Sequence, residues 1–363
     1  MATQSEPVPQ SESTSTTTKT LRVGTRRSQL ARIQTDIVVA AVHAQFPEYK
    51  CDIHAIDPLG DRDKITALYA FNAKSLWTEE LEVLLEGGEL DFIVHSLKDM
   101  PTQLPTTLSI GAIFPREDPR DALVLSPSLL APSMTPSQTN AHDILNSLPK
   151  GSIIGTSSLR RSAQLKRSYP HLDFADVRGN VPTRLRKLDD PSSFTDQVVP
   201  QYAALILAAA GLMRLGLGDR ITKLLSKNEG GCLHAVGQGA IGVEVRTRDE
   251  NTKALIKKLG CWDTTRACLA ERSLMRTLEG GCSVPIGVET EWPEKDSLLM
   301  RAVVVSLDGS EAVEAEVVQK VADEESAEEL GREVARILVK RGAGDILGKI
   351  VLNRNIIAEQ GAA

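Results

Sequence analysis

Cys282 lies on a stretch of the sequence where a bulky molecule could reach a thiol. Gly280 and Gly281 directly precede it and end an apolar helical pattern over residues 269–278. A second apolar run starts at Val284, followed by a proline of the kind tolerated at a strand start. The pattern is typical of a helix and a strand joined by an open turn. The thiol is therefore either reactive or one more small buried core residue, and the local pattern leaves both interpretations open.

Basic residues are concentrated between positions 152 and 187. This stretch holds eight Arg or Lys and two Asp, in a chain whose formal net charge is −6. Three of its arginines follow turn signals, namely Arg160, Arg178 and Arg184. A helix start in the same stretch adds hydroxyl donors at Thr156, Ser157 and Ser158. Arginine forks bind carboxylates in a bidentate way, at about 1.5–3 kcal/mol for each charged contact. The patch could also suit phosphates, but the chain has no Walker loop, so a ligand with several carboxylates is favoured.

Asp99 is an acid just beyond the end of a predicted strand. It stands next to Lys98, and such neighbours most often form a surface ion pair of little energetic value. Its place at a strand end favours a catalytic role instead. We also expect no other carboxylate in the same cleft, which would leave Asp99 as the acid there.

The elements expected around these residues alternate between strand and helix. Apolar periodicity predicts, in order, strand 21–25, helix 26–44, strand 51–56, helix 76–86 and strand 91–95. This alternation is typical of an α/β lobe with a largely parallel sheet, in which ligands bind beyond the carboxyl ends of the strands. Gly24–Ser28 and Ser96–Pro101 should therefore lie at a cleft. The turn-rich segment 57–74 is a candidate lid.

A second α/β lobe begins at Ser152 and repeats the start of the first. VGTRRSQL at 23–30 is matched by IGTSSLRRSAQL at 154–165, each a strand, a Gly-Thr turn and the start of a helix. The chain should enter this lobe near 116–119, in a loop-rich stretch 115–148, and return to the first lobe through 235–240 and a strand at 241–246. The apolar run 203–210 predicts a buried strand, and 190–201 predicts a surface insertion.

The pattern changes after Cys282. Strands are expected at 284–290, 298–306 and 312–321, the last two joined at Asp308 and Gly309, and helices at 326–341 and 345–353. These elements predict a small α+β domain that presents Cys282 to the two lobes.

Composition limits the class of partner. A chain of 363 residues should form two or three domains. The net charge of −6 and 4% aromatic residues argue against nucleic acid, and no apolar run is long enough for a membrane span. Five cysteines without CxxC spacing and six scattered histidines indicate a reducing compartment and no metal site. Residues 1–19 lack the apolar core of a secretion signal, so we expect a disordered tail on a cytoplasmic protein. Separately, we expect a monomer.

The chain after residue 20 resembles the porphobilinogen deaminase (hydroxymethylbilane synthase) family. The motifs that carry the resemblance, in the family's order, are RVGTRRSQLARIQ, KSLWTEELE, VHSLKDMPT, GTSSLRRSAQL, RGNVPTRLRKLD, AVGQGAIGVEVR and LEGGCSVPIG. The resemblance implies two lobes similar to type II periplasmic binding proteins and a small α+β C-terminal domain. The expected division is a tail at 1–19, a first domain at 20–117 plus 237–260, a second at 118–236 and a third at 261–363.

The resemblance also implies a reaction and a cofactor. Four porphobilinogen molecules would be joined head to tail with release of ammonia, on a dipyrromethane held by a thioether bond to Cys282. No metal or nucleotide is implied. Asp99 would hydrogen-bond pyrrole N–H groups and stabilise the cation left when ammonia departs. The implied cofactor-side residues are Cys282, Ser96, Lys98, Asp99, Thr156, Ser157, Ser158, Arg160, Arg161, Arg184 and Gln238. The implied substrate-side residues are Arg26, Ser28, Arg178 and Arg214.

Two other classes of protein fit part of the pattern. A non-catalytic binding protein for small carboxylates would share the two lobes, but it requires neither a third domain nor a Gly-Gly-Cys turn. An acyl-transferring cysteine enzyme needs a histidine base near the thiol, and none is adjacent to Cys282 in the sequence. The mass of the intact protein would separate these alternatives.

Overall fold

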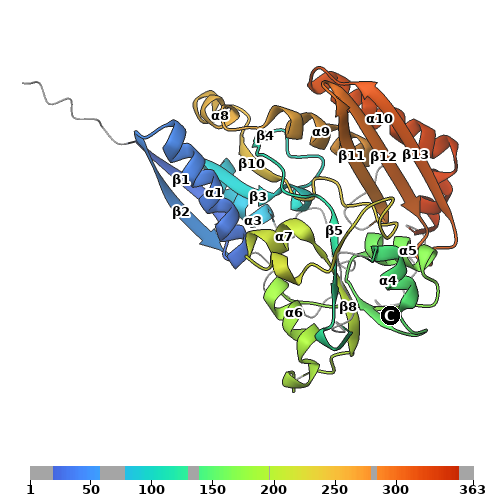
Figure 1. The fold of residues 1–363 in the computed structure, drawn as a ribbon. Helices are drawn as coiled ribbons and strands as arrows, with labels where there is room; N and C mark the ends of the chain where they lie inside the picture. The colour runs from blue at the N-terminus through green and yellow to red at the C-terminus, as the bar shows by residue number, and fades with distance from the viewer. Residues whose placement is uncertain (1–18, 58–77, 130–138, 196, 279–283, 351–363) are drawn as a thin grey trace, which may run out of the picture.

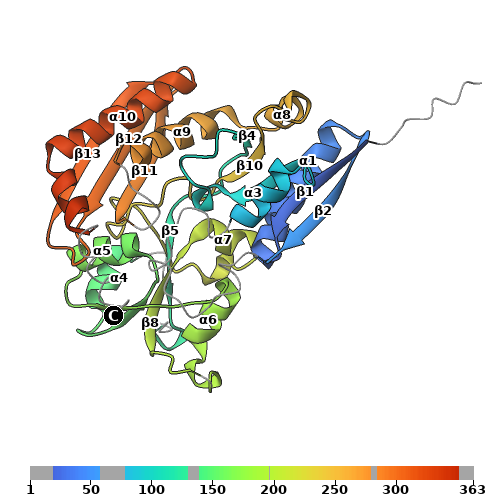
Figure 2. The same cartoon turned by 180° about the vertical axis from the view of Figure 1, so that it is seen from behind.

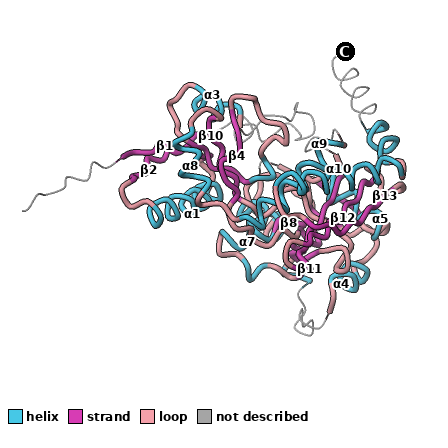
Figure 3. Tube along the Cα trace, turned by 90° about the horizontal axis from the view of Figure 1, so that it is seen from above, coloured by secondary structure: helices cyan, strands magenta, loops and turns pink. Residues whose placement is uncertain are grey.

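The computed structural model describes residues 19–57, 78–129, 139–195, 197–278 and 284–350 (Figure 1). Cys282, nearly all of the predicted tail and lid, and the end of the last predicted helix lie outside these residues. Two lobes and a third domain each contain one sheet, and in Figure 3 the first sheet and the third domain lie at opposite ends of the molecule.

The first sheet has five strands and is parallel except for one. Its order is β2 (Tyr49–Ile56), β1 (Lys19–Arg26), β3 (Phe92–Ser96), β10 (Ile241–Arg246) and β4 (Leu108–Ile113). Only β10 runs antiparallel to its neighbours β3 and β4. Alternate residues of the strands face opposite sides. On one side they pack against α1 (Gln29–Gln45) and α8 (Glu250–Lys257), and on the other against α3 (Glu79–Glu86).

The second sheet repeats this arrangement. Its order is β7 (Asp173–Ala175), β6 (Ile153–Gly155), β8 (Tyr202–Ala208), β5 (Asp121–Leu125) and β9 (Lys223–Leu225), and β5 is antiparallel to both of its neighbours. One face packs against α4 (Ala141–Ser147) and α5 (Leu159–Ser168). The other face packs against α6 (Val181–Asp189) and α7 (Ala209–Arg214).

The predicted repeat of the Gly-Thr turn has a structural counterpart. β1 and β6 hold the same place in their sheets, between an edge strand and a central parallel strand. A Cβ on Gly24 would lie 2.5 Å from Leu90 Cδ1, and one on Gly155 would lie 2.4 Å from Leu205 Cδ2. A side chain at either position would therefore collide with a core leucine, which accounts for a glycine in both copies.

In each sheet, the antiparallel strand is the one that the chain enters after crossing from the other lobe. β4 ends at Ile113 in the first sheet and β5 begins at Asp121 in the second, while β10 brings the chain back to the first sheet. The outgoing crossing at 114–120 and the return crossing at 235–240 are hydrogen-bonded to each other, because Glu117 N donates to Gly239 O at 3.2 Å. Gly239 has φ +86°, and a Cβ there would lie 2.3 Å from Glu117 O. Only glycine suits this close approach.

The third domain packs helices against a three-stranded antiparallel sheet. The strands are β11 (Ile286–Glu294), β12 (Ser297–Val305) and β13 (Ala312–Lys320), and the helices are α9 (Trp262–Thr277) and α10 (Glu324–Lys340). Figure 2 shows α10 lying along this sheet. A Cβ on Gly331 of α10 would lie 2.2 Å from Ala270 O of α9, so a glycine permits the two helices to pack closely.

Three details of the expected elements were wrong. The stretch 115–148 contains β5 and α4, because a four-residue apolar run, ALVL at 122–125, is enough for a strand buried between two others. The run 203–210 changes from strand to helix at Ala209, in keeping with the high helix propensity of alanine. The strand expected at 21–25 runs through Arg26, which pairs with Ile56, so α1 begins only at Gln29.

Candidate functional site

The carboxyl ends of β1 and β3 bring Arg26 and Asp99 together. β1 ends at Arg26, and β3 leads into a 3-10 turn at Leu97–Asp99. Arg26 Nη1 lies 3.3 Å from Asp99 Oδ2, with the side chains 21% and 29% exposed. Since these strands are parallel neighbours, residues beyond their carboxyl ends meet at the same edge of the sheet. The partly exposed carboxylate of Asp99 therefore faces a fixed cation and remains open to solvent.

The two serines predicted near this pair have local partners. Ser28 caps α1 by accepting a hydrogen bond from Ala31 N at 3.4 Å. Ser96 Oγ donates to Gln34 Oε1 at 3.0 Å, which ties the end of β3 to α1. Both hydroxyls thus help to fix the backbone that carries Arg26 and Asp99.

Lys98 is a cation held in a position that disfavours its charge. Burial lowers the pKa of its ammonium from 10.5 to about 8, against the attraction of Asp99. Arg161 and Arg160 of the second lobe lower the pKa further, while Asp121 raises it. The turn that carries Asp99 therefore faces the cationic side of the second lobe.

Asp121 is the centre of a buried charged network and was missed in the sequence. Its carboxylate is fully buried and accepts from Arg160 Nη1 at 2.6 Å and from Arg161 Nε at 2.9 Å. Gln238 Nε2 donates to it as well, at 2.9 Å. Burial alone would raise the pKa of Asp121, but the two guanidinium groups outweigh this effect and hold it far below its usual range.

The expectation of no further carboxylate beside Asp99 was therefore wrong. Asp121 is the first residue of β5, a strand that was not recognised, so the acid had no predicted place at the cleft. The recognisable signal was an acid directly before the apolar run ALVL at 122–125. Arg160 and Arg161 were predicted to bind a ligand, and both donate hydrogen bonds to this carboxylate.

Arg178 and Arg184 supply further positive charge. Arg178 Nη1 is buried and has no hydrogen-bond partner within the described part of the chain. Arg184 Nε donates to Gly179 O at 2.8 Å. Burial, together with Arg161 and Arg178, lowers the pKa of Arg184 to about 10. These cations destabilise one another, and an anion placed among them would relieve the repulsion.

The hydroxyls at the second Gly-Thr turn organise the start of α5. Ser158 caps the helix by accepting from Arg161 N at 3.4 Å, and Thr156 Oγ1 accepts from Ser158 N at 3.2 Å. Ser157 Oγ donates to Val177 O at 2.9 Å. The helix start that carries the arginines is thus held rigidly by its own side chains.

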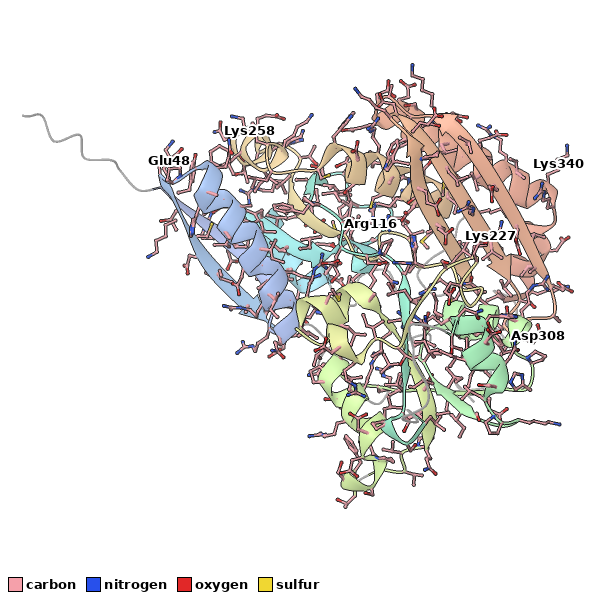
Figure 4. All side chains as sticks on the ribbon, in the orientation of Figure 1. Glu48, Arg116, Lys227, Lys258, Asp308 and Lys340 are labelled. Carbon is pink, nitrogen blue, oxygen red and sulfur yellow. The ribbon has the colours of Figure 1, made fainter. Side chains whose placement is uncertain are left out.

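The crossings between the lobes also carry functional candidates. Arg214 Nη2 donates to Gly239 O at 2.7 Å, so this predicted residue is bound to the return crossing. Arg116, labelled near the centre of Figure 4, donates from Nε to Gln238 O at 2.7 Å. Arg116 Nη1 also lies 2.6 Å from Glu271 Oε1 of α9, a carboxylate that is fully buried. These contacts join both crossings to the third domain.

The donors beside the turns of the two lobes suit a group with several carboxylates. Arg178 has an unused buried N–H, and burial together with neighbouring cations lowers the pKa values of Lys98 and Arg184. Within the described ranges no group of three or more His, Cys, Asp or Glu could hold a metal ion. No described helix is long and apolar enough to cross a bilayer.

Two family models match the chain. "Porphobilinogen deaminase, dipyromethane cofactor binding domain" matches residues 21–254, and "Porphobilinogen deaminase, C-terminal domain" matches 265–340. Similar curated proteins are named porphobilinogen deaminase. That of Yarrowia lipolytica is 51% identical over 91% of this chain and 93% of its own length. That of Candida albicans is 47% identical over 93% of this chain and 95% of its own length. That of Saccharomyces cerevisiae is 45% identical over 93% of this chain and 98% of its own length.

Among solved structures, the L-cystine solute receptor of Neisseria gonorrhoeae is 13% identical, with 74% of this chain and 95% of that one covered and a TM-score of 0.35.

Proposed function

The chain belongs to the porphobilinogen deaminase family, and from this premise we propose that it is a hydroxymethylbilane synthase. It joins four porphobilinogen molecules head to tail, releases ammonia at each condensation and yields hydroxymethylbilane for tetrapyrrole synthesis. Its fold is α/β, with two lobes that each contain a five-stranded sheet and a small α+β C-terminal domain.

The observation that carries this proposal is the excess of buried positive charge between the lobes. Porphobilinogen bears an acetate and a propionate, so a growing chain of pyrroles adds two carboxylates with each unit. Arg178 offers an unused buried donor, and Lys98 and Arg184 have pKa values lowered to about 8 and about 10. A polycarboxylate bound there would restore the balance of charge.

The family's dipyrromethane cofactor fits this arrangement. We propose that it is attached to Cys282 and that the first lobe, the second lobe and the return crossing each contribute to its binding. The proposed residues are Ser96, Lys98, Asp99, Thr156, Ser157, Ser158, Arg160, Arg161, Arg184 and Gln238. When bound, the group supplies the pyrrole position to which the first substrate is joined.

Asp99 is the proposed catalytic residue. Its partly exposed carboxylate can accept hydrogen bonds from pyrrole N–H groups and stabilise the positive charge that develops as the amine departs. Arg26, at 3.3 Å, keeps this carboxylate oriented. Arg26, Ser28 and Arg178 would bind the carboxylates of the incoming substrate, and Arg214 would line the path of the lengthening product.

The same proposal covers the division into domains and the setting of the enzyme. We assign the first domain to 20–117 plus 237–260, the second to 118–236 and the third to 261–363. The chain passes from the first sheet to the second between β4 and β5 and returns to the first at β10, which supports the two boundaries between the first and second domains. We propose further that the enzyme acts as a monomer in the cytoplasm.

Two measurements on the purified protein test the function. Its intact mass should exceed the mass of the chain by that of one dipyrromethane, and porphobilinogen should be consumed with release of ammonia. A protein with the unmodified mass that bound small carboxylates without ammonia release would instead be a binding protein, and the proposal would be rejected.

A further inference from the structure

Helix α9 contacts the segment that directly follows Asp99. Arg272 of α9 is only 2% exposed, although it carries a full positive charge. Its Nη2 donates to Pro101 O at 2.5 Å and its Nη1 to Met100 O at 3.4 Å. The two carbonyls belong to the first residues after the turn that ends at Asp99. The planar guanidinium can bind both at once, which a single ammonium cannot do in the same way.

The helix continues this contact one turn to either side of Arg272. Cys268 belongs to the same small buried cluster as Leu97 and Met100. Arg276 Nη1 donates to Thr102 O at 3.3 Å. Residues spaced by four lie on one face of a helix, so these three side chains form a continuous stripe against residues 97–102.

β10 and the residue before it contact the same segment. Leu97 N donates to Ala240 O at 3.0 Å, just before β10 begins. A Cβ on Gly242 would lie 2.8 Å from Met100 Sδ and 2.9 Å from Leu97 Cδ1, so the strand packs directly on the turn. The backbone around Asp99 is therefore held by both β10 of the first sheet and α9 of the third domain.

We propose that Arg272 is a positioning residue for the condensation reaction, acting through the backbone of Met100 and Pro101 to hold Asp99 in place. This inference rests on the proposed function.

The test uses three variants of α9 in the full-length protein. R272M keeps the apolar stem and removes the two donors, and R272K restores a charge with a different geometry. R266M is the matched control. Arg266 is also buried on α9 at 3% exposure, but it pairs with Asp263 and Asp296 inside the third domain.

The expected result separates positioning from stability. R272M should keep the mass of the bound cofactor and a KM within about twofold of the wild type. Its kcat should fall by about tenfold to a hundredfold, as expected when a reacting group is displaced by about 1 Å. R272K should recover part of the loss, and R266M should keep the wild-type kcat. Hydrogen exchange at the amides of residues 98–100 and 102 should quicken in R272M and not in R266M.

Arg276 provides a variant that should fold even if R272M does not. Its side chain is 30% exposed, and R276M should lower kcat in the same direction but less, with KM unchanged. A kcat within twofold of the wild type in folded R272M or R276M would overturn the proposal, as would an equal loss in R266M. The proposed function fails separately, if the wild-type protein does not convert porphobilinogen.

Discussion

Replacing Lys98 with methionine should stabilise the cofactor-free protein while impairing catalysis. Burial holds the pKa of Lys98 at about 8 instead of 10.5, so the folded protein binds its proton less tightly than the unfolded chain does. The cost to stability is full below pH 8 and is relieved as the pH rises toward 10.5. From the two pKa values it amounts to about 3 kcal/mol at pH 7 and to about half of that at pH 9.5. Methionine keeps most of the apolar stem and removes the charge.

The assay is urea unfolding of cofactor-free protein, produced in cells that cannot make porphobilinogen, at several pH values between 7 and 9.5. K98M should exceed the wild type in unfolding free energy by most of the calculated amount at pH 7, and the gain should shrink by about half at pH 9.5. K257M is the control, since Lys257 is exposed on α8 and its replacement should give no such trend. A gain that does not vary with pH, or a loss of stability at pH 7, would refute the assignment of Lys98 as a cation destabilised by burial. K98M should also lose activity, because the same charge is proposed to bind cofactor carboxylates.

Three further changes test other parts of the site. D99A should abolish ammonia release while intact mass and circular dichroism show a folded protein with its cofactor; near-normal turnover would remove Asp99 from the mechanism. C282A should fold but lack the added mass, and a retained covalent pyrrole adduct would place the attachment elsewhere. E82Q should alter the pH dependence of stability, because burial raises the pKa of Glu82 above its ordinary value of 4.5. The contribution of this carboxyl to folding is therefore full below pH 4.5. It is lost as the pH rises through the folded-state pKa. Urea unfolding at pH 5 to 8 should show E82Q gaining on the wild type with rising pH, and a constant difference would contradict this.

The sequence predicted those parts of the site that depend on local pattern. Gly24 and Gly155 precede the two predicted cleft turns, and each is required because a core leucine leaves no room for a side chain. The position of Asp99 followed from a strand of recognisable apolar residues. Such features are encoded within a few residues of the chain, so periodicity and turn chemistry are enough to find them.

Asp121 could not be placed in this way. Its role depends on Arg160 and Arg161, about forty residues away in the sequence, and on Gln238 at the other crossing. A short strand in a proline-rich stretch gave no periodic signal, and pairing between distant residues is absent from a local pattern. The same holds for Arg272, whose partners are backbone carbonyls and therefore leave no trace in residue type.

Asp121 also explains why the cleft can hold arginines before a ligand arrives. Two guanidinium groups on one carboxylate satisfy its charge and leave a surplus of one positive charge, in a site from which water is largely excluded. A buried guanidinium without any partner would cost several kcal/mol, whereas a shared carboxylate keeps the pair folded and oriented. Removing the carboxylate would leave both arginines uncompensated, and adding a second resident acid would cancel the surplus that attracts the ligand. A single acid between two arginines thus meets both requirements, for a stable fold and for a cleft that binds carboxylates.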